Sequence, residues 1–410
     1  MSNTMSLPGF RQIAALLLLL SLPLRAADII PIEVQMPGTQ PGEVGNLEGA
    51  DRCDNCHQDD DPVVTIAHDW RGSMMSHAGR DPLYWSTVAI AEQDFDGSGD
   101  LCIRCHTMGG WLAGRSTPTN GSALTEADAA AGVSCDVCHL MTNPDGSEHA
   151  GEQTAPFIAN DGATPDPAGF YGSGELVISD SGSKLGPYDN AVPKHHWDQS
   201  LFHRSVDFCG SCHDVSNPVV GDLAPNNGAQ VPLPAADRGS KFAGDELTEK
   251  AAFNFFPHQY GVVERTYSEY KASLFPETLV SEYDTDPGFP AELKDGSIKA
   301  AHDAALLAGT GGNYADNSPR YFSCQSCHMM PEVGLGANKQ GVPTRTDLPR
   351  HDLTGGNYWM LEVIQYMDAQ DTLLLGGGLS SAEIAGLNDG ALRARQNLEN
   401  AAALSVTGNT

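Results

Sequence analysis

The spacing of apolar and polar residues along this chain predicts a few helices separated by long irregular stretches. The helical candidates are 66–93, broken near Pro82, then 194–208, 262–275 and 380–404, the last with a serine N-cap signal. The inserts 141–193 and 214–250 are rich in Gly, Pro, Asp, Asn and Ser, which favours irregular loops. No segment shows convincing strand alternation. We therefore expect a mainly α fold with much irregular loop and little β structure.

An apolar run near the N-terminus predicts export. Arg11 precedes the run from Ile13 to Leu24, and the small Ala26 follows it, so residues 1–26 have the pattern of a signal peptide. A membrane anchor is the alternative, but the run is short for a span of about 20 residues. No later segment is apolar enough to cross a membrane. We therefore expect a periplasmic or extracellular protein whose mature chain has no membrane span.

The net charge of the chain limits the classes of partner that it is expected to bind. Asp and Glu number 53 against 23 Lys and Arg, for a formal net charge of −30. Such a chain is not expected to bind nucleic acid or an anionic membrane, because both would repel it. The acidity would suit a basic partner, although keeping an exported protein soluble is the simpler explanation.

The ten cysteines form five pairs with one local pattern. Two residues separate the members of each pair, and a histidine follows the second cysteine directly. The pairs are Cys53 with Cys56, Cys102 with Cys105, Cys135 with Cys138, Cys209 with Cys212 and Cys324 with Cys327, and the histidines are His57, His106, His139, His213 and His328. C-x-x-C-H is the attachment site of c-type haem, where both thiols bond the porphyrin and the histidine ligates iron. Zinc sites or disulfides would leave the five histidines unexplained, so the sequence predicts five covalently bound haem c groups.

Five porphyrins would also supply apolar mass that the chain itself lacks. Aromatic residues make up only 7% of it, which predicts a thin conventional core. The fold should therefore depend on the cofactor. We expect one pentahaem cytochrome domain at 51–375, preceded by an extended lead-in at 27–50 and followed by a C-terminal helix at 376–410.

Each iron needs a second axial ligand unless it is left open. Nine histidines lie outside the motifs, which is more than five irons require. As candidate iron ligands we select His68, His77, His196, His203, His258 and His351. We rank three others below them, namely His149, His195 and His302.

Helix geometry supports part of this selection. On a helix over 194–208, His196 and His203 would face one side, about 10 Å apart along the axis. In 66–79, His68 and Met75 would share one face and His77 the opposite one, and Met75 is an alternative ligand. His351 precedes two glycines, Gly355 and Gly356, which would leave room for a flat ring.

The stretch DFDGSGD at 94–100 matches the start of a calcium-binding loop. Asp94, Asp96, Ser98 and Gly99 occupy positions 1, 3, 5 and 6 of an EF-hand loop. Position 12 would be Cys105, so the closing bidentate Glu is absent. We prefer an acidic turn to a calcium site.

Several motifs carry a resemblance to known cytochromes. HDWRGSMMSHA at 68–78 and HWDQSLFH at 196–203 resemble the elements that supply distal histidines in the tetrahaem cytochromes of nitrifiers and the hydroxylamine-oxidoreductase group. SMMSHAGRDPLYW, LCIRCHTMGGWLAGR, GVSCDVCH, FCGSCHDVSNP and RHDLTGGNYW resemble a group of exported multihaem cytochromes, from about residue 52 to 404. The resemblance implies a fold organised around stacked covalent haems.

Two departures from these groups bear on function. Larger members continue beyond a helix like 380–404 into a β-sandwich with a further histidine motif, whereas this chain ends at ALSVTGNT, so we expect a short or truncated form. No C-x-x-C-K occurs, so the lysine-ligated catalytic haem of the pentahaem nitrite reductases is not expected.

Three functions remain open at this point. We favour an electron carrier in respiratory electron transfer, because the surplus of second-ligand candidates would close every iron. Its partners would be other cytochromes or a membrane quinol-oxidising complex. The alternatives are an oxidoreductase acting on a small nitrogen or sulfur compound at one open haem, and a subunit of an oligomeric or filament-forming cytochrome.

Overall fold

The computed structural model describes residues 36–45, 47–58, 65–94, 97–155, 157–161, 169, 171–217 and 262–401. These ranges are mostly helix and loop with a few small strands, which confirms the mainly α prediction. The predicted signal peptide, the first part of the lead-in (27–35) and the segment 218–261, which contains His258, lie outside the described residues. Among the helices that are described, none is long and apolar enough to cross a membrane.

Short helices carry the five cysteine motifs. They are α2 (Ala50–His57), α5 (Gly99–His106), α8 (Cys135–His139), α9 (Val206–Gly210) and α13 (Cys324–His328). In a helix, residues i, i+3 and i+4 lie on one face, so a single turn presents both thiols and the imidazole together. The fourth motif differs because α9 ends at Gly210, and Cys212 and His213 follow it in a turn.

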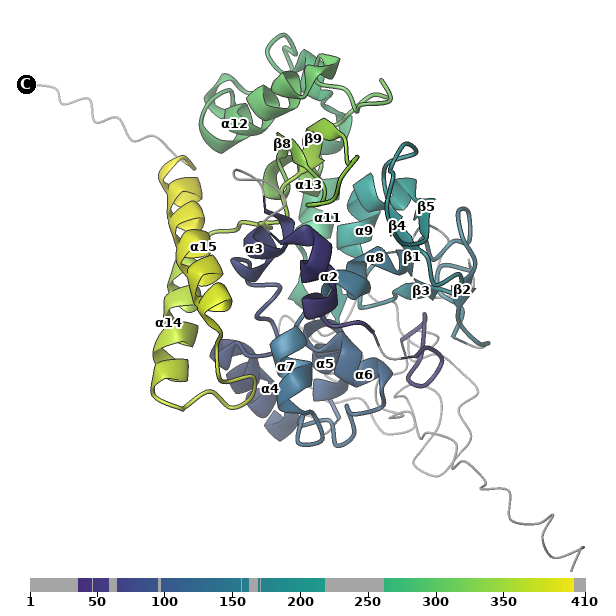
Figure 1. Ribbon diagram of the computed structural model, residues 1–410, viewed down its shortest axis with the longest axis vertical. Coiled ribbons are helices and arrows are strands. Elements are labelled where there is room, and N and C mark those ends of the chain that lie inside the picture. Colours follow the sequence, from purple (N-terminus) through teal and green to yellow (C-terminus); the bar gives the residue numbers. More distant parts are fainter. Residues whose placement is uncertain are drawn as a thin grey trace, which may run out of the picture.

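The remaining helices surround these motifs. They are α3 (Ile66–Arg71), α4 (Pro82–Asp94), α6 (Met108–Leu112), α7 (Glu126–Ala131), α11 (Thr266–Lys271), α12 (Gly296–Ala305), α14 (Tyr358–Ala369) and α15 (Ser381–Glu399). Short 3-10 and π turns are η1 (Leu201–Arg204), η4 (Phe275–Glu277), η5 (Val280–Glu282), η6 (Ala291–Leu293) and η7 (Leu306–Thr310). In Figure 1, α14 and α15 lie side by side along one edge of the molecule, with α3 against α15.

Within the described ranges the strands are short and form four small sheets. They are β1 (Met141–Thr142), β2 (Gly151–Glu152), β3 (Val177–Ser179), β4 (Lys184–Gly186), β5 (Trp197–Gln199), β6 (Val215–Ser216), β7 (Val262–Glu264), β8 (Pro331–Leu335) and β9 (Thr344–Pro349). The antiparallel order β1-β3-β2, the parallel pair β4-β5 and the antiparallel pairs β6-β7 and β8-β9 make up the sheets. The β8–β9 hairpin follows α13 almost directly and shows that the expectation of no strand alternation was wrong there.

Three of the four predicted helices need correction. The region 66–93 forms two helices separated by turns at 72–80, and Pro82 begins α4 rather than breaking a helix, a position that proline favours. The region 194–208 is not one helix, because β5 pairs there with β4 and η1 and α9 follow. His196 and His203 therefore share no helix face. The region 262–275 begins as β7 and becomes helical only at α11.

The C-terminal helix prediction is confirmed. Ser380 caps α15 by accepting the backbone N–H of Glu383, whose carboxylate in turn accepts the Ser380 N–H. A Cβ atom added to Gly390 would overlap the carbonyl oxygen of Gly72, so only glycine permits this close approach of α15 to the end of α3. Helix α15 is therefore packed closely against α3.

Candidate haem-binding sites

The five motif histidines share one hydrogen-bonding arrangement. Nδ1 of each ring contacts an acceptor on a distant segment: His57 with Gly336 O at 2.7 Å, His106 with Ala78 O at 3.1 Å, His139 with Leu185 O at 2.7 Å, His213 with Glu264 Oε1 at 3.0 Å and His328 with Thr354 O at 2.7 Å. Such an acceptor holds the proton on Nδ1 and leaves the Nε2 lone pair for a metal. Across the described chain, no hydrogen bond engages Nε2 of these rings. All five sites therefore fit the proximal histidine of a haem c.

One hairpin serves two of these sites. Gly336 follows β8, and its carbonyl binds the first motif histidine, whereas Thr354 lies in the turn after β9 and binds the last one. His351 lies in the same turn. The hairpin that sequence patterning missed therefore joins the first and fifth motifs.

Cysteines of different motifs meet in pairs. The thiols of Cys53 and Cys135, of Cys105 and Cys212, and of Cys209 and Cys324 are hydrogen-bonded neighbours. Cys138 also acts electrostatically on Cys209 and Cys212. All ten cysteines are free thiols, so none is committed to a disulfide. The contacts connect motif 1 to motif 3, motif 3 to motif 4, and motif 4 to motifs 2 and 5.

Four motif cysteines stand outside these thiol pairs: Cys138, which acts on its neighbours only electrostatically, and Cys56, Cys102 and Cys327. Cys56 is a half-buried free thiol, and its backbone carbonyl accepts the N–H of Asn338 at 2.8 Å. This bond ties the first motif to the segment after β8. The thiol of Cys102 contacts the carbonyl of Ser98 at 3.8 Å, and Cys327 packs against the apolar cluster around Phe322. Anchoring of haem by all ten motif cysteines stays a prediction of their spacing, and for Cys56, Cys102 and Cys327 no cross-motif thiol contact accompanies it in the described chain.

His351 lies where a second ligand for the third motif would be needed. Its ring centre is 6.1 Å from that of His139, and the two ring planes differ by 23°. Two imidazoles on opposite sides of one metal have ring centres about 6 Å apart, because each metal–nitrogen bond is about 2 Å long. The Nδ1 of His351 donates to Pro349 O at 2.9 Å, which leaves Nε2 free. Burial lowers the pKa of His351 to about 3, so the ring is a neutral donor.

His203 also lies beside His139, with 5.9 Å between ring centres. Its Nε2 is engaged by the carbonyl of Cys138 at 2.9 Å, whereas its buried Nδ1 has no hydrogen-bond partner. Burial lowers the pKa of His203 to about 3. A buried, unpartnered nitrogen on a neutral ring is a candidate metal donor, and here it is Nδ1.

The two histidines of the 66–80 region are held by polar partners. Nε2 of His77 donates to the carbonyl of Arg71 at 2.8 Å, and Arg80 donates to its Nδ1 at 3.0 Å. Burial lowers the pKa of His77 to about 4, helped by the Arg80 charge. Nε2 of His68 contacts Asp389 of α15 at 2.8 Å. Ligation of iron by His77 or His68 stays a prediction and would require these contacts to break.

The remaining histidines each contact something other than a motif histidine through a hydrogen bond, or are exposed. His196 is exposed, whereas the neighbouring His195 binds the His196 carbonyl through Nδ1 at 2.9 Å and acts electrostatically on His57. His195, which the sequence analysis ranked below His196 as an iron ligand, therefore lies near the first motif. His149 binds the carbonyl of Gln199, and the buried His302 binds Asp303.

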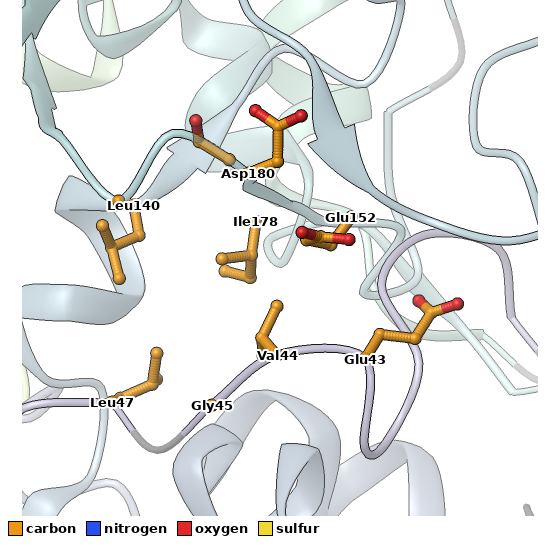
Figure 2. A pocket seen from close by; sticks show the side chains of 10 residues that line it. Glu43, Val44, Gly45, Leu47, Leu140, Glu152, Ile178 and Asp180 are labelled. Carbon is orange, nitrogen blue, oxygen red and sulfur yellow. The ribbon is translucent and has the colours of Figure 1, made fainter.

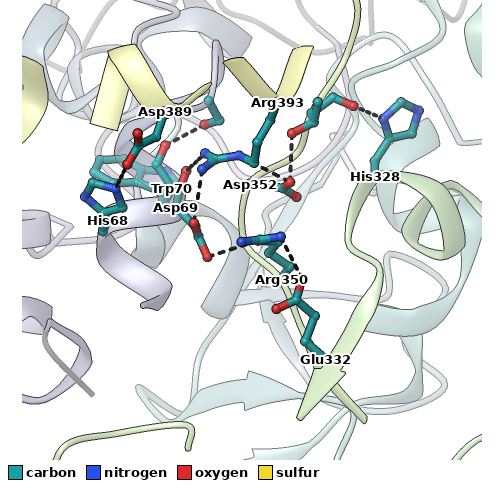
Figure 3. Close-up of polar contacts among 11 residues, drawn as sticks. His68, Asp69, Trp70, His328, Glu332, Arg350, Asp352, Asp389 and Arg393 are labelled. Atoms are coloured by element: carbon teal, nitrogen blue, oxygen red, sulfur yellow. Dashed lines mark hydrogen bonds and ion pairs between the residues drawn. The ribbon is translucent and has the colours of Figure 1, made fainter. Parts of the chain in front are cut away.

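A network of ion pairs holds the turn that carries His351. Arg350 and Arg393 reach the buried carboxylate of Asp69 from two sides, at 3.4 and 3.3 Å (Figure 3). Arg350 also pairs with Glu332 of β8 at 2.6 Å, and Arg393 lies 3.5 Å from Asp352. The residues before and after His351 are therefore tied to α3, β8 and α15.

The fourth motif has a carboxylate where the other four have a carbonyl. Glu264 of β7 accepts from His213, and this hydrogen bond raises the pKa of His213 although burial opposes it. Burial works to raise the pKa of Glu264, but the hydrogen bonds from His213 and Thr266 and the charge of His213 together outweigh it and lower that pKa. A carboxylate acceptor makes the imidazole a stronger electron donor to a metal.

A cavity of about 250 Å³ lies beside the third motif. Figure 2 shows apolar side chains of Val44, Leu140 and Ile178 at its floor, with the carboxylates of Glu152 and Asp180 near its edge. No motif cysteine or histidine lines it. The cavity is therefore separate from the haem attachment points.

The predicted acidic turn at 94–100 is described only in part. Asp96 lies outside the described residues, and Glu92 supplies a carboxylate to the Gly99 N–H at 2.5 Å and to the Thr119 hydroxyl at 2.9 Å. In the ranges that the structure covers, no group of three or more His, Cys, Asp or Glu residues is arranged to hold a metal ion.

Comparison with known proteins gives one match. Residues 52–140, which hold the first three motifs, match the family model described as cytochrome c554 and c-prime. Neither a curated protein nor a solved structure matches the chain. The match, the five motifs and the free Nε2 atoms together support a c-type cytochrome, with covalently bound haem and a role in haem-based electron transfer.

Proposed function

We propose that the chain binds five haem c groups, one at each cysteine motif, and carries electrons in periplasmic or extracellular respiratory electron transfer. The observation that carries this proposal is the shared geometry of the five motif histidines. Each holds its Nδ1 on an acceptor and keeps Nε2 free. The grouping with tetrahaem and hydroxylamine-oxidoreductase-related cytochromes is part of the proposal.

The side chains have distinct tasks in this function. The haem iron supplies reversible one-electron oxidation and reduction when it is bound. The ten cysteines would anchor the haems, the motif histidines would each ligate an iron, and His351 would supply a second ligand at the third motif. Since cysteines of neighbouring motifs touch, the thioether edges of neighbouring haems would meet at those sulfurs. The contacts support one continuous, branched path with the fourth motif at the branch.

The charge of the protein supports a basic redox partner. A surface with net charge −30 attracts a cationic face of another cytochrome or of a membrane quinol-oxidising complex and speeds encounter at low salt. Electron transfer to such a partner should slow as ionic strength rises. An oligomer that extends the haem path between copies would be compatible with the same surface.

Haem counting tests the proposal directly. The full chain, expressed with its own N-terminal segment in a host that matures c-type cytochromes, is analysed for haem content and intact mass. We expect five haems per chain and a reductive titration that takes up five electrons. A double variant that combines Cys324→Ser with Cys327→Ser should lose one haem. Fewer than five haems in the unaltered protein would refute the proposal.

Spectroscopy separates the carrier from an enzyme with an open iron. Low-temperature EPR of the oxidised protein, before and after cyanide, should show low-spin iron throughout and no response to cyanide. A high-spin signal that cyanide converts would identify an exchangeable site and would favour catalysis on a small nitrogen or sulfur compound.

A further inference from the structure

Arginine and tyrosine side chains form a cluster beside the fifth motif. The guanidinium carbons of Arg204 and Arg320 lie 4.3 and 4.5 Å from the ring centre of Tyr314. The Tyr314 hydroxyl also hydrogen-bonds with Ser323, the N-cap of α13. Two cations therefore share one aromatic ring next to a haem attachment site.

Two arginines of this cluster have carboxylate partners. Arg204 pairs with Asp316 at 2.8 Å. Arg345 pairs with Asp347 at 3.1 Å and lies 3.4 Å from the ring centre of Tyr188. The carboxylates of Asp316 and Asp347 are therefore each engaged by another arginine than Arg320.

Arg320 has no such partner. It is only 6% exposed, and its Nε is a buried atom without a hydrogen bond. Over the described ranges, no ion pair or hydrogen bond engages its guanidinium. The Asp347 carboxylate acts on Arg320 electrostatically but is bonded to Arg345. Burial lowers the pKa of Arg320, and the charge of Arg204 adds to this effect.

An unpaired, buried guanidinium is strongly unfavourable, because it loses its hydration without gaining a counter-charge. A guanidinium keeps its proton at any physiological pH, so it does not escape this loss by becoming neutral. A chain with 53 acidic residues had many ways to place a carboxylate here, yet the position is left open. The site is thus built for an anion that the polypeptide does not provide.

We propose that Arg320, with Tyr188 and Tyr314 beside it, binds a carboxylate-like oxyanion. Planar oxyanions match the forked donors of a guanidinium. The chemistry has two possible sources, a haem propionate or a free small oxyanion from solution. The propionate source rests on the proposed haems, whereas the free oxyanion does not.

The test compares Arg320→Met and Arg320→Lys with the unaltered protein. Arg395→Gln is the control, because it breaks the exposed ion pair between Arg395 and Glu362. Haem content is counted first, which separates failure of the site from failure of haem attachment. The holoprotein is then dialysed into buffer without small oxyanions. Its Tm is measured as acetate is added, and its haem potentials are titrated.

A bound propionate predicts that Arg320→Met lowers Tm by roughly 5 °C or more at every acetate concentration, with one haem shifted to lower potential. A free oxyanion predicts that acetate raises the Tm of the unaltered protein but not that of Arg320→Met. In both cases the Tm of Arg320→Lys should lie between that of Arg320→Met and that of the unaltered protein. Arg395→Gln should have the same Tm as the unaltered protein. If Arg320→Met has an equal or higher Tm with no response to acetate, the guanidinium is simply unpaired and the proposal is wrong.

Discussion

The turn after β9 and the segment at 72–80 each carry a histidine with a lowered pKa, but the nitrogens of the two imidazoles are hydrogen-bonded differently. His351 has a pKa of about 3 and keeps Nε2 free, 6.1 Å from the ring centre of His139. His77 has a pKa of about 4, and both of its nitrogens are hydrogen-bonded. Burial alone does not make a ligand. What distinguishes the two is whether a nitrogen is left without a partner.

The difference follows from what packs against each segment. Arg80 approaches His77 because Glu383, at the N-terminus of α15, holds the guanidinium at 2.8 Å. The turn with His351 is held instead through its neighbours, Arg350 and Asp352, so the imidazole itself stays uncommitted. Helix α15 contributes to both arrangements.

Replacing the two histidines in turn gives the largest expected contrast. His351→Ala should convert one haem from low spin to high spin, because an axial nitrogen is lost. His77→Ala should leave the EPR spectrum low-spin and lower only the stability. If His77→Ala produces the high-spin haem and His351→Ala does not, the comparison is inverted and His77 is the ligand.

Breaking the Glu383–Arg80 pair should cost about 3 kcal/mol of stability, because the nearly buried Arg80 is left unpaired. Burial works to raise the pKa of Glu383, but Arg80 and Ser380 outweigh it and lower that pKa to about 2 from 4.5. The stabilisation is therefore present above about pH 4.5 and is lost as pH falls towards 2.

Glu383→Gln should remove this pH dependence, as measured by denaturant unfolding of the holoprotein between about pH 2 and 5, the range over which the stabilisation is lost. Asp389→Asn is the matched control on the same helix, since its partner His68 is partly exposed. Equal pH profiles for Glu383→Gln and the unaltered protein would show that the pair contributes little.

Removing Arg393 should loosen the turn that carries His351. Arg393→Gln is expected to destabilise the protein by about 2 kcal/mol, because Asp69 is buried and loses one of two cationic partners. Its EPR signals should broaden for one haem, whereas Arg395→Gln, which breaks an exposed pair, should change stability by less than about 0.5 kcal/mol. Identical EPR spectra for the two variants would show that Arg393 does not position His351.

The smallest expected effect concerns Glu264. Glu264→Gln replaces the carboxylate at His213 Nδ1 by a neutral acceptor, so the imidazole donates less electron density and ferric iron is less stabilised. One haem should rise in potential, by about 59 mV for each tenfold change in its one-electron equilibrium. Redox potentiometry measures this, with Glu269→Gln on α11 as control. A shift to lower potential would contradict the role assigned to Glu264.

Local sequence determined the attachment sites and the C-terminal helix. Two thiols and an imidazole at i, i+3 and i+4 need only one helical turn to face the same way, and Ser380 with Glu383 needs only its own backbone to form a capping box. These arrangements depend on residues within four positions of each other, so spacing alone predicts them.

The second ligands and the polar partners were decided by the tertiary structure. The helix expected over 194–208 is absent because β4 pairs with β5, so the helix-face argument for His196 and His203 does not hold. The acceptor for His57 comes from 279 residues away and that for His328 from 26. A free or occupied imidazole nitrogen depends on which distant carbonyl or charge packs against it, and no local spacing encodes that contact.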